Sequence, residues 1–155
     1  MRKLVVYCHG YNGSPASEKV ARLRETGASV YAWNIDIDPS ISLPYLEHEF
    51  NMVLLDDLHS PLKLVFVGTS LGGWYAAELA AAYQCDSVII NPSYNPRESL
   101  AKYGIAETIL EKYTPIKLSK HAKYFFGAND DVIDYSEFLP LLAEYDFEIV
   151  AGAGH

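Results

Sequence analysis

The sequence has 155 residues, of which 50% are hydrophobic and 21% are charged. This balance is typical of a globular protein, and the length predicts a single domain over residues 1–155. The formal net charge is −8 at pH 7. Nucleic acids and anionic membrane surfaces are therefore disfavoured as partners, because both would repel the chain.

The cysteines and the apolar segments indicate where the protein resides. The sequence has two cysteines, Cys8 and Cys85, without a Cys-x-x-Cys pair, and this predicts free buried thiols. The apolar segment near the N-terminus stops at His9, which is too early for a secretion signal. No segment approaches the roughly 20 apolar residues of a membrane helix. We therefore expect a cytoplasmic protein.

Short apolar segments alternate with longer amphipathic ones along the chain. Segments of strand length, rich in β-branched or aromatic residues, are Leu4–Cys8, Ser29–Trp33, Leu64–Val67, Ser87–Ile90, Lys123–Phe126 and Phe147–Val150. The predicted helices between them are Ser17–Thr26, Pro44–His59, Leu71–Tyr83 and Tyr135–Ala143. Continuously apolar strands suit a parallel sheet with both faces covered. The alternation predicts a three-layer α/β fold with about six mostly parallel strands.

One connection, over residues 95–119, is longer than the others and departs from the alternation. It predicts two short helices, one that starts at Pro96 and one over Ala106–Tyr113. We expect these helices to form a small cap.

The most informative motif is Gly-x-Ser-x-Gly at residues 68–72, between a predicted strand and a predicted helix. A serine hydroxyl stands clear at the end of a sheet only if the chain turns sharply there. Such a turn crowds Gly68 and Gly72, which are small by steric need. It also leaves the N–H of Leu71 at the helix start, free to hold an oxyanion. The motif predicts Ser70 as a nucleophile, and a glycine turn needed only for packing is the alternative.

Two adjacent aspartates, Asp130 and Asp131, follow the fifth predicted strand. A carboxylate at this edge of a sheet can orient an imidazole and stabilise the imidazolium that forms when a serine loses its proton. A turn-forming role without catalysis is the alternative for both residues. From the residues alone, either aspartate is a candidate for the acid.

The sequence Gly-Ala-Gly-His at residues 152–155 follows the last predicted strand. Small residues bring the backbone close to the site, so that His155 can reach Ser70 as a general base. The order serine, aspartate, histidine is the chain order of an α/β hydrolase. Other histidines have no metal-ligand spacing, and we expect solvated or packed roles for His48, His59 and His121.

Three segments stand out together: His-Gly-Tyr-Asn-Gly-Ser-Pro at 9–15, Gly-Thr-Ser-Leu-Gly-Gly-Trp-Tyr-Ala at 68–76, and Ile-Ile-Asn-Pro-Ser-Tyr-Asn-Pro at 89–96. In this order they resemble the YqiA-like esterases, small members of the α/β-hydrolase superfamily. The resemblance extends from about residue 4 to residue 155. It implies activity on short acyl esters or thioesters without a metal or an organic cofactor, and a catalytic triad of Ser70, Asp130 and His155.

The resemblance also implies roles for the loop after the first strand. In α/β hydrolases a His-Gly pair here shapes the oxyanion loop, so Tyr11 supplies the second N–H donor and His9 braces the loop. The turn form Gly-x-x-Asp-x-x-Val/Ile, common in hydrolases, favours Asp130 over Asp131. Relatives normally continue past the histidine into a closing helix. We expect either a shortened fold or cover from a partner or a homo-oligomer.

Three residues near the predicted site are candidates for substrate contacts. Asn91 and Tyr94 follow the strand after the nucleophile helix, where Asn91 can pin loops and Tyr94 can wall an acyl pocket. A proline-stiffened turn is the alternative. Trp74, which follows the Gly-x-Ser-x-Gly motif, is either a substrate contact or part of the helix packing.

The sequence thus predicts a serine esterase that hydrolyses a small acyl ester through an acyl-enzyme. An acyl-CoA thioesterase or an acyltransferase on the same site is one alternative. A binding protein that keeps the fold without catalysis is the other.

Overall fold

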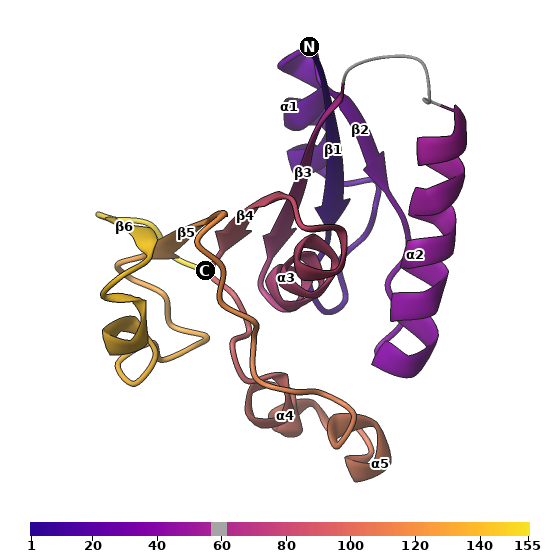
Figure 1. Cartoon of the computed structure of the whole chain (residues 1–155). Helices are drawn as coiled ribbons and strands as arrows, with labels where there is room; N and C mark the ends of the chain where they lie inside the picture. Colours follow the sequence, from indigo (N-terminus) through magenta and orange to yellow (C-terminus); the bar gives the residue numbers. More distant parts are fainter. Residues whose placement is uncertain (57–61) are drawn as a thin grey trace.

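The structure, a computed structural model, describes residues 1–56 and 62–155 and is built on one parallel sheet (Figure 1). The described strands lie in the order β2-β1-β3-β4-β5-β6, and each pairs in parallel with its neighbours. Their bounds are β1 Arg2–Cys8, β2 Ser29–Ala32, β3 Leu62–Thr69, β4 Asp86–Ile90, β5 Ala122–Gly127 and β6 Asp146–Val150. The predicted parallel sheet is confirmed.

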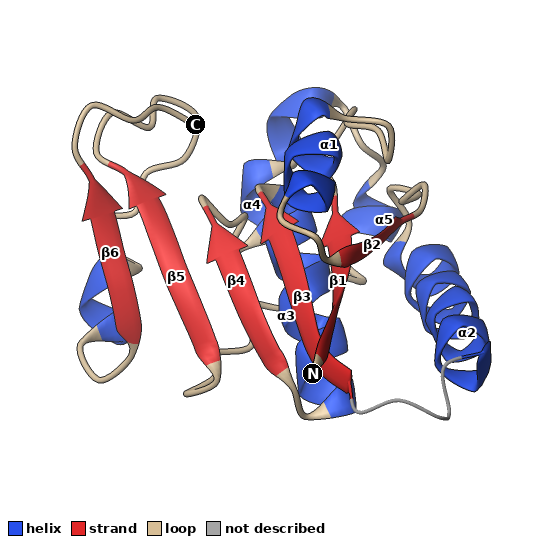
Figure 2. Cartoon of the chain, turned by 90° about the horizontal axis from the view of Figure 1, so that it is seen from above, coloured by secondary structure: helices blue, strands red, loops and turns tan. Residues whose placement is uncertain are grey.

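The parallel arrangement brings the carboxyl ends of the strands to one edge of the sheet (Figure 2). The register places Thr69, the last residue of β3, opposite Ile90 in β4, and Ile90 opposite Phe125 in β5. The loops that follow these strands therefore leave from neighbouring points. Ligand sites of open α/β sheets lie at this edge.

Helices cover both faces of the sheet, as Figure 2 shows for α1 and α3. Their bounds are α1 Glu18–Glu25, α2 Pro39–Asp56, α3 Leu71–Tyr83, α4 Pro96–Ser99 and α5 Glu107–Leu110, with 3₁₀ turns η1 Ala101–Tyr103 and η2 Leu139–Leu142. Phe50 of α2 and Tyr75 of α3 are fully buried in the core on one face, where Phe50 packs edge-on against Phe66. Val20 of α1 packs on the other face, over Val67. The three predicted layers are present.

Helix α2 begins before its predicted start at Pro44. The Asp38 carboxylate accepts a hydrogen bond from the Ser40 N–H in the first turn and so stabilises an earlier start. Pro44 lies inside the helix and lacks the N–H of a regular helical residue. The helix nevertheless continues, because buried residues such as Leu46 hold its inner face against the core. The end predicted at His59 lies outside the described residues.

The predicted helix over 135–143 is wrong, since this segment forms only the 3₁₀ turn η2. The N–H groups of Phe138 and Leu139 both donate to the carbonyl of Tyr135. Pro140 has no N–H with which to continue an α-helical ladder. In the connection 95–119, the two predicted helices are single turns, α4 and α5.

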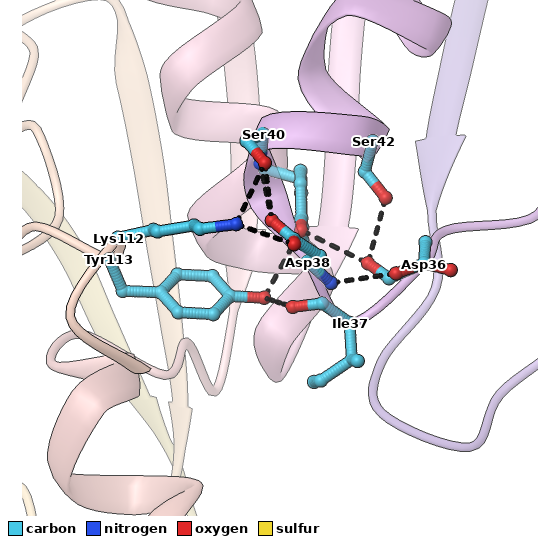
Figure 3. Close-up of polar contacts among 8 residues, drawn as sticks. Asp36, Ile37, Asp38, Ser40, Ser42, Lys112 and Tyr113 are labelled. Atoms are coloured by element: carbon cyan, nitrogen blue, oxygen red, sulfur yellow. Dashed lines mark hydrogen bonds and ion pairs between the residues drawn. The ribbon is translucent and has the colours of Figure 1, made fainter. Parts of the chain in front are cut away.

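A polar cluster anchors the chain after α5 to the start of α2 (Figure 3). The Lys112 ammonium donates to the Asp38 carboxylate at 2.6 Å and to the Ser40 hydroxyl at 3.0 Å. The Tyr113 hydroxyl donates to the carbonyl of Ile37 at 2.7 Å. This cluster holds the connection 95–119 to the body of the protein.

Neither 1–56 nor 62–155 contains a helix long and apolar enough to cross a membrane.

Candidate active site

Ser70 lies at the sharp turn between β3 and α3. Its φ of 56° and ψ of −124° are unusual for a residue with a side chain. Backbone hydrogen bonds fix the turn: the Ser70 N–H donates to Ile90, and the Ser70 carbonyl accepts from Gly73 and Ser93. The neighbouring strand β4 and the loop after it therefore hold the serine in this strained conformation.

The glycines around the serine allow close approach of backbone to backbone. A Cβ on Gly68 would lie 2.1 Å from the carbonyl oxygen of Gly72. A Cβ on Gly72 would lie 2.0 Å from the carbonyl oxygen of Cys8 in β1. No side chain fits at either position without a shift of the backbone, as the motif predicted.

The structure brings Ser70, His155 and Asp130 together in one hydrogen-bonded chain. The Ser70 Oγ lies 2.8 Å from Nε2 of His155. Nδ1 of the same ring lies 2.6 Å from Oδ2 of Asp130. With the ring proton on Nδ1, the imidazole donates to the carboxylate and presents a lone pair to the serine hydroxyl. This geometry suits removal of the serine proton by His155.

Asp130, rather than Asp131, contacts the imidazole. The side chain of Asp130 is only 3% exposed, and its Oδ1 accepts hydrogen bonds from the N–H groups of Val132 and Ile133. Burial alone would raise the pKa of this carboxyl, but hydrogen bonds from His155 and the two N–H groups outweigh it and lower the pKa. Asp130 is thus held as a carboxylate, whereas Asp131 is exposed.

Asn91, a candidate both for pinning loops and for contacting substrate, ties the loop that carries His155 to the sheet. It is 5% exposed, and its φ is 43°. Its amide Nδ2 donates to the carbonyls of Gly154 and His155, at 3.1 and 3.3 Å, and its Oδ1 accepts from the Gly127 N–H at 2.7 Å. One buried side chain therefore connects the ends of β4 and β5 with the backbone of His155.

We expect Asn91→Ala to lower the free energy of unfolding by about 2–3 kcal/mol, because it leaves three backbone groups without their partner. A displaced His155 should also lower kcat by about 10²-fold. Urea unfolding and ester hydrolysis measure the two effects.

Two variants separate the causes of the Asn91 effect. Asn91→Gly removes the amide but tolerates the positive φ, so it should be more stable than Asn91→Ala yet equally poor in kcat. Asn129→Ala removes an exposed amide beside Asp130 and should match the wild type. A normal kcat in both Asn91 variants would contradict the positioning role.

His9 is fully engaged in bracing the loop after β1. Its Nδ1 lies 2.8 Å from the Gly10 carbonyl, and its Nε2 accepts the Ile35 N–H at 3.1 Å. The ring therefore carries its proton on Nδ1 and has no lone pair left for a serine. Gly10 lies against the nucleophile, since a Cβ on it would be 3.2 Å from the Cβ of Ser70. The loop thus passes directly beside the serine.

Tyr11 and Leu71 are the two residues predicted to donate N–H groups to an oxyanion. Both line the same pocket as Ser70. Leu71 is the first residue of α3, where N–H groups have no partner within the helix. Within the described ranges, neither N–H donates to a protein acceptor. Both N–H groups thus belong to residues of the pocket wall and have no acceptor within the described protein.

The pocket beside Ser70 has a volume of about 340 Å³. One part of its wall comes from β1 and the start of α1, with Tyr7, Ser17 and Lys19. Another part comes from the connection after β4, where the Tyr103 ring packs at a tilt of 36° against Tyr11, with ring centroids 4.8 Å apart. The local sequence carries no catalytic or binding motif at Tyr7, Lys19 or Tyr103, and none of the three was predicted at this site.

Two other candidate substrate contacts lie away from this pocket. Trp74 is 2% exposed, and its indole N–H donates to the Thr114 carbonyl at 2.7 Å, so it belongs to the core. Tyr94 stacks on Phe138, with ring centroids 4.5 Å apart, and lines a neighbouring pocket of about 330 Å³. The residues that wall the serine pocket are therefore different from those predicted.

No three His, Cys, Asp or Glu side chains gather as metal ligands within the described part of the chain. The chemical groups of the site are a hydroxyl, an imidazole, a carboxylate and backbone N–H donors.

A family model agrees with the span of this site. The model of the family described as "Uncharacterised protein family (UPF0227)" matches residues 4–155. The match includes every residue of the hydrogen-bonded chain, and it confirms the resemblance to the YqiA-like esterases.

Solved structures share the arrangement of the elements. Est1E from Butyrivibrio proteoclasticus has a TM-score of 0.70 at 15% identity, with 99% of this chain and 80% of that chain covered. An esterase from Pyrococcus furiosus has a TM-score of 0.71 at 17% identity, with coverage of 99% and 74%. Alpha/beta hydrolase domain-containing protein 10 from mouse has a TM-score of 0.69 at 12% identity, with coverage of 98% and 80%. At these identities the likeness shows the α/β-hydrolase fold.

Proposed function

The chain belongs to the UPF0227 family and has the α/β-hydrolase fold, and we propose that it is a serine esterase whose nucleophile is Ser70. The observation that carries the proposal is the chain of hydrogen bonds from Ser70 through His155 to Asp130, at 2.8 and 2.6 Å. Serine hydrolases need a base within hydrogen-bond reach of the nucleophile and an acid that orients the base.

In the first half of the reaction, Nε2 of His155 takes the proton of the Ser70 hydroxyl as Oγ attacks the carbonyl carbon of the ester. The carbonyl oxygen becomes an oxyanion, and the N–H groups of Tyr11 and Leu71 stabilise it. The Asp130 carboxylate stabilises the imidazolium. The imidazolium then returns the proton to the leaving alcohol, and the acyl group stays on Ser70.

In the second half, water replaces the alcohol. Nε2 of His155 takes a proton from this water, which attacks the acyl-enzyme and forms a second oxyanion in the same place. Collapse of this intermediate releases the acid and restores the Ser70 hydroxyl with the proton from His155. The pocket of about 340 Å³ is at the small end of ligand sites, which supports short acyl esters as substrates.

Fluorophosphonate labelling tests the proposal, because the probe reacts with a serine only when a base activates it. We expect one adduct per chain by intact mass, located on Ser70 by peptide mapping. His155→Ala should lose the adduct over the same time, because no base remains.

The control variant is Ser14→Ala, which removes another hydroxyl that lines the pocket. It should keep full labelling, whereas Ser70→Ala should show none. A well-folded wild-type protein without an adduct would contradict the proposal and favour a binding role. An adduct that persists in His155→Ala would assign the base to another residue.

A further inference from the structure

Charged side chains are distributed unequally between the two pockets at the carboxyl edge of the sheet. The pocket that Tyr94 lines has three carboxylates in its wall, Glu98, Asp134 and Glu137. No Asp or Glu side chain is among the described residues that line the serine pocket, and its wall includes Lys19. The charge that lines the serine pocket is thus opposite in sign to the net charge of the protein, which is −8.

Lys19 lines the pocket from the first turn of α1, where it is exposed. Ser17 caps this helix by accepting the N–H of Val20, and Lys19 lies in its first turn. The adjacent carboxylate of Glu18 bonds instead to Arg22 at 2.5 Å. Among residues 1–56 and 62–155, no side chain forms an ion pair with Lys19. Its ammonium is therefore available to a ligand.

Neutral polar groups surround this part of the wall. The Tyr7 hydroxyl lies 2.9 Å from the Thr69 hydroxyl, and both residues line the pocket with Ser17. Thr69 is the residue directly before the nucleophile. The wall that contains Lys19 and Ser70 thus also contains neutral hydroxyl groups that can hydrogen-bond to a polar ligand.

We propose that Lys19 selects esters that carry a negative charge, such as a carboxylate, a few atoms from the scissile bond. The inference rests on the proposed function and adds the class of substrate. The negative group can belong to the acyl part or to the alcohol part of the ester. In either case, an ammonium without a protein partner gains an ion pair and hydrogen bonds when the substrate binds. The net charge of the protein repels anions elsewhere, so the charge of Lys19 should have a measurable effect on the preference for anionic esters.

Matched chromogenic esters test the proposal. For the acyl part, the pair is the mono-4-nitrophenyl ester of glutaric acid and 4-nitrophenyl pentanoate. For the alcohol part, 4-nitro-3-(pentanoyloxy)benzoate replaces the first ester. We expect Lys19→Gln to lower kcat/KM for the anionic ester of one pair about tenfold, between the effects of an exposed ion pair and a charged hydrogen bond. The neutral ester should change little, and high salt should reduce the wild-type preference.

Lys19→Arg and Lys102→Gln are the matched controls. The arginine variant keeps the charge and should keep the preference. Lys102 lines the neighbouring pocket, so its loss should leave the preference as in the wild type. An unchanged ratio of anionic to neutral ester in Lys19→Gln, for both pairs, would overturn the proposal.

A binding measurement makes the result independent of catalysis. The monomethyl ester of glutaric acid should bind to Ser70→Ala protein in calorimetry more tightly than to Ser70→Ala with Lys19→Gln. Equal binding would overturn the role of Lys19. Wild-type protein that hydrolyses no ester and takes no fluorophosphonate contradicts the esterase proposal alone, because the binding comparison still decides on Lys19.

Discussion

Asp130→Asn is expected to lower kcat for ester hydrolysis by about 10⁴-fold, the scale found when a triad carboxylate becomes an amide. The carboxylate accepts the Nδ1 proton of His155 at 2.6 Å. An amide nitrogen in its place would donate to Nδ1, leave the proton on Nε2, and so remove the lone pair that takes the serine proton. The measurement is kcat with a 4-nitrophenyl ester at neutral pH.

The adjacent aspartate provides the matched control. Asp131→Asn makes the same change in charge one residue along the chain, at an exposed side chain. It should keep kcat within about twofold, because exposed charges away from the reacting atoms contribute little. A larger loss in Asp131→Asn than in Asp130→Asn would reverse the assignment of the acid.

Gly72→Ala is expected to lower the free energy of unfolding by more than about 4 kcal/mol or to prevent folding. Alanine in a helix is normally favoured over glycine by about 1 kcal/mol, so propensity alone predicts the opposite sign. Packing decides the outcome here, since the new Cβ would lie 2.0 Å from the carbonyl oxygen of Cys8. Either β1 or α3 would have to move, and both position the site.

Gly104→Ala is the control for the glycine prediction. Gly104 has a φ of 71°, and a Cβ there would meet nothing within 4 Å. Only the strained backbone then opposes alanine, at about 1–2 kcal/mol. Urea unfolding of both variants gives the comparison. A Gly72→Ala protein as stable as Gly104→Ala would show that the strand and helix can separate at no great cost.

The sheet and the sequence positions of its candidate chemical groups follow from the amino-acid sequence alone. Apolar strands alternating with helices predict a parallel sheet, and a parallel sheet brings all the strand ends to one edge. The residues that follow those ends, Ser70, Asp130 and His155, are far apart in the chain. They were nevertheless predictable as neighbours, because each lies in the short segment that follows the carboxyl end of a strand, after Thr69, Gly127 and Val150.

Which nearby side chains face the pocket depends on how the layers pack and could not be predicted from local sequence patterns. Asn91 and Trp74 follow the strand ends closely but turn inward, to Gly154 and to Thr114, because buried amide and indole groups need partners. Lys19 lies in a helix with no chemical motif and yet lines the pocket beside the serine. Such contacts join residues 40 to 64 positions apart or belong to different elements. Local sequence patterns do not predict these contacts, since the contacts depend on how the layers pack against one another.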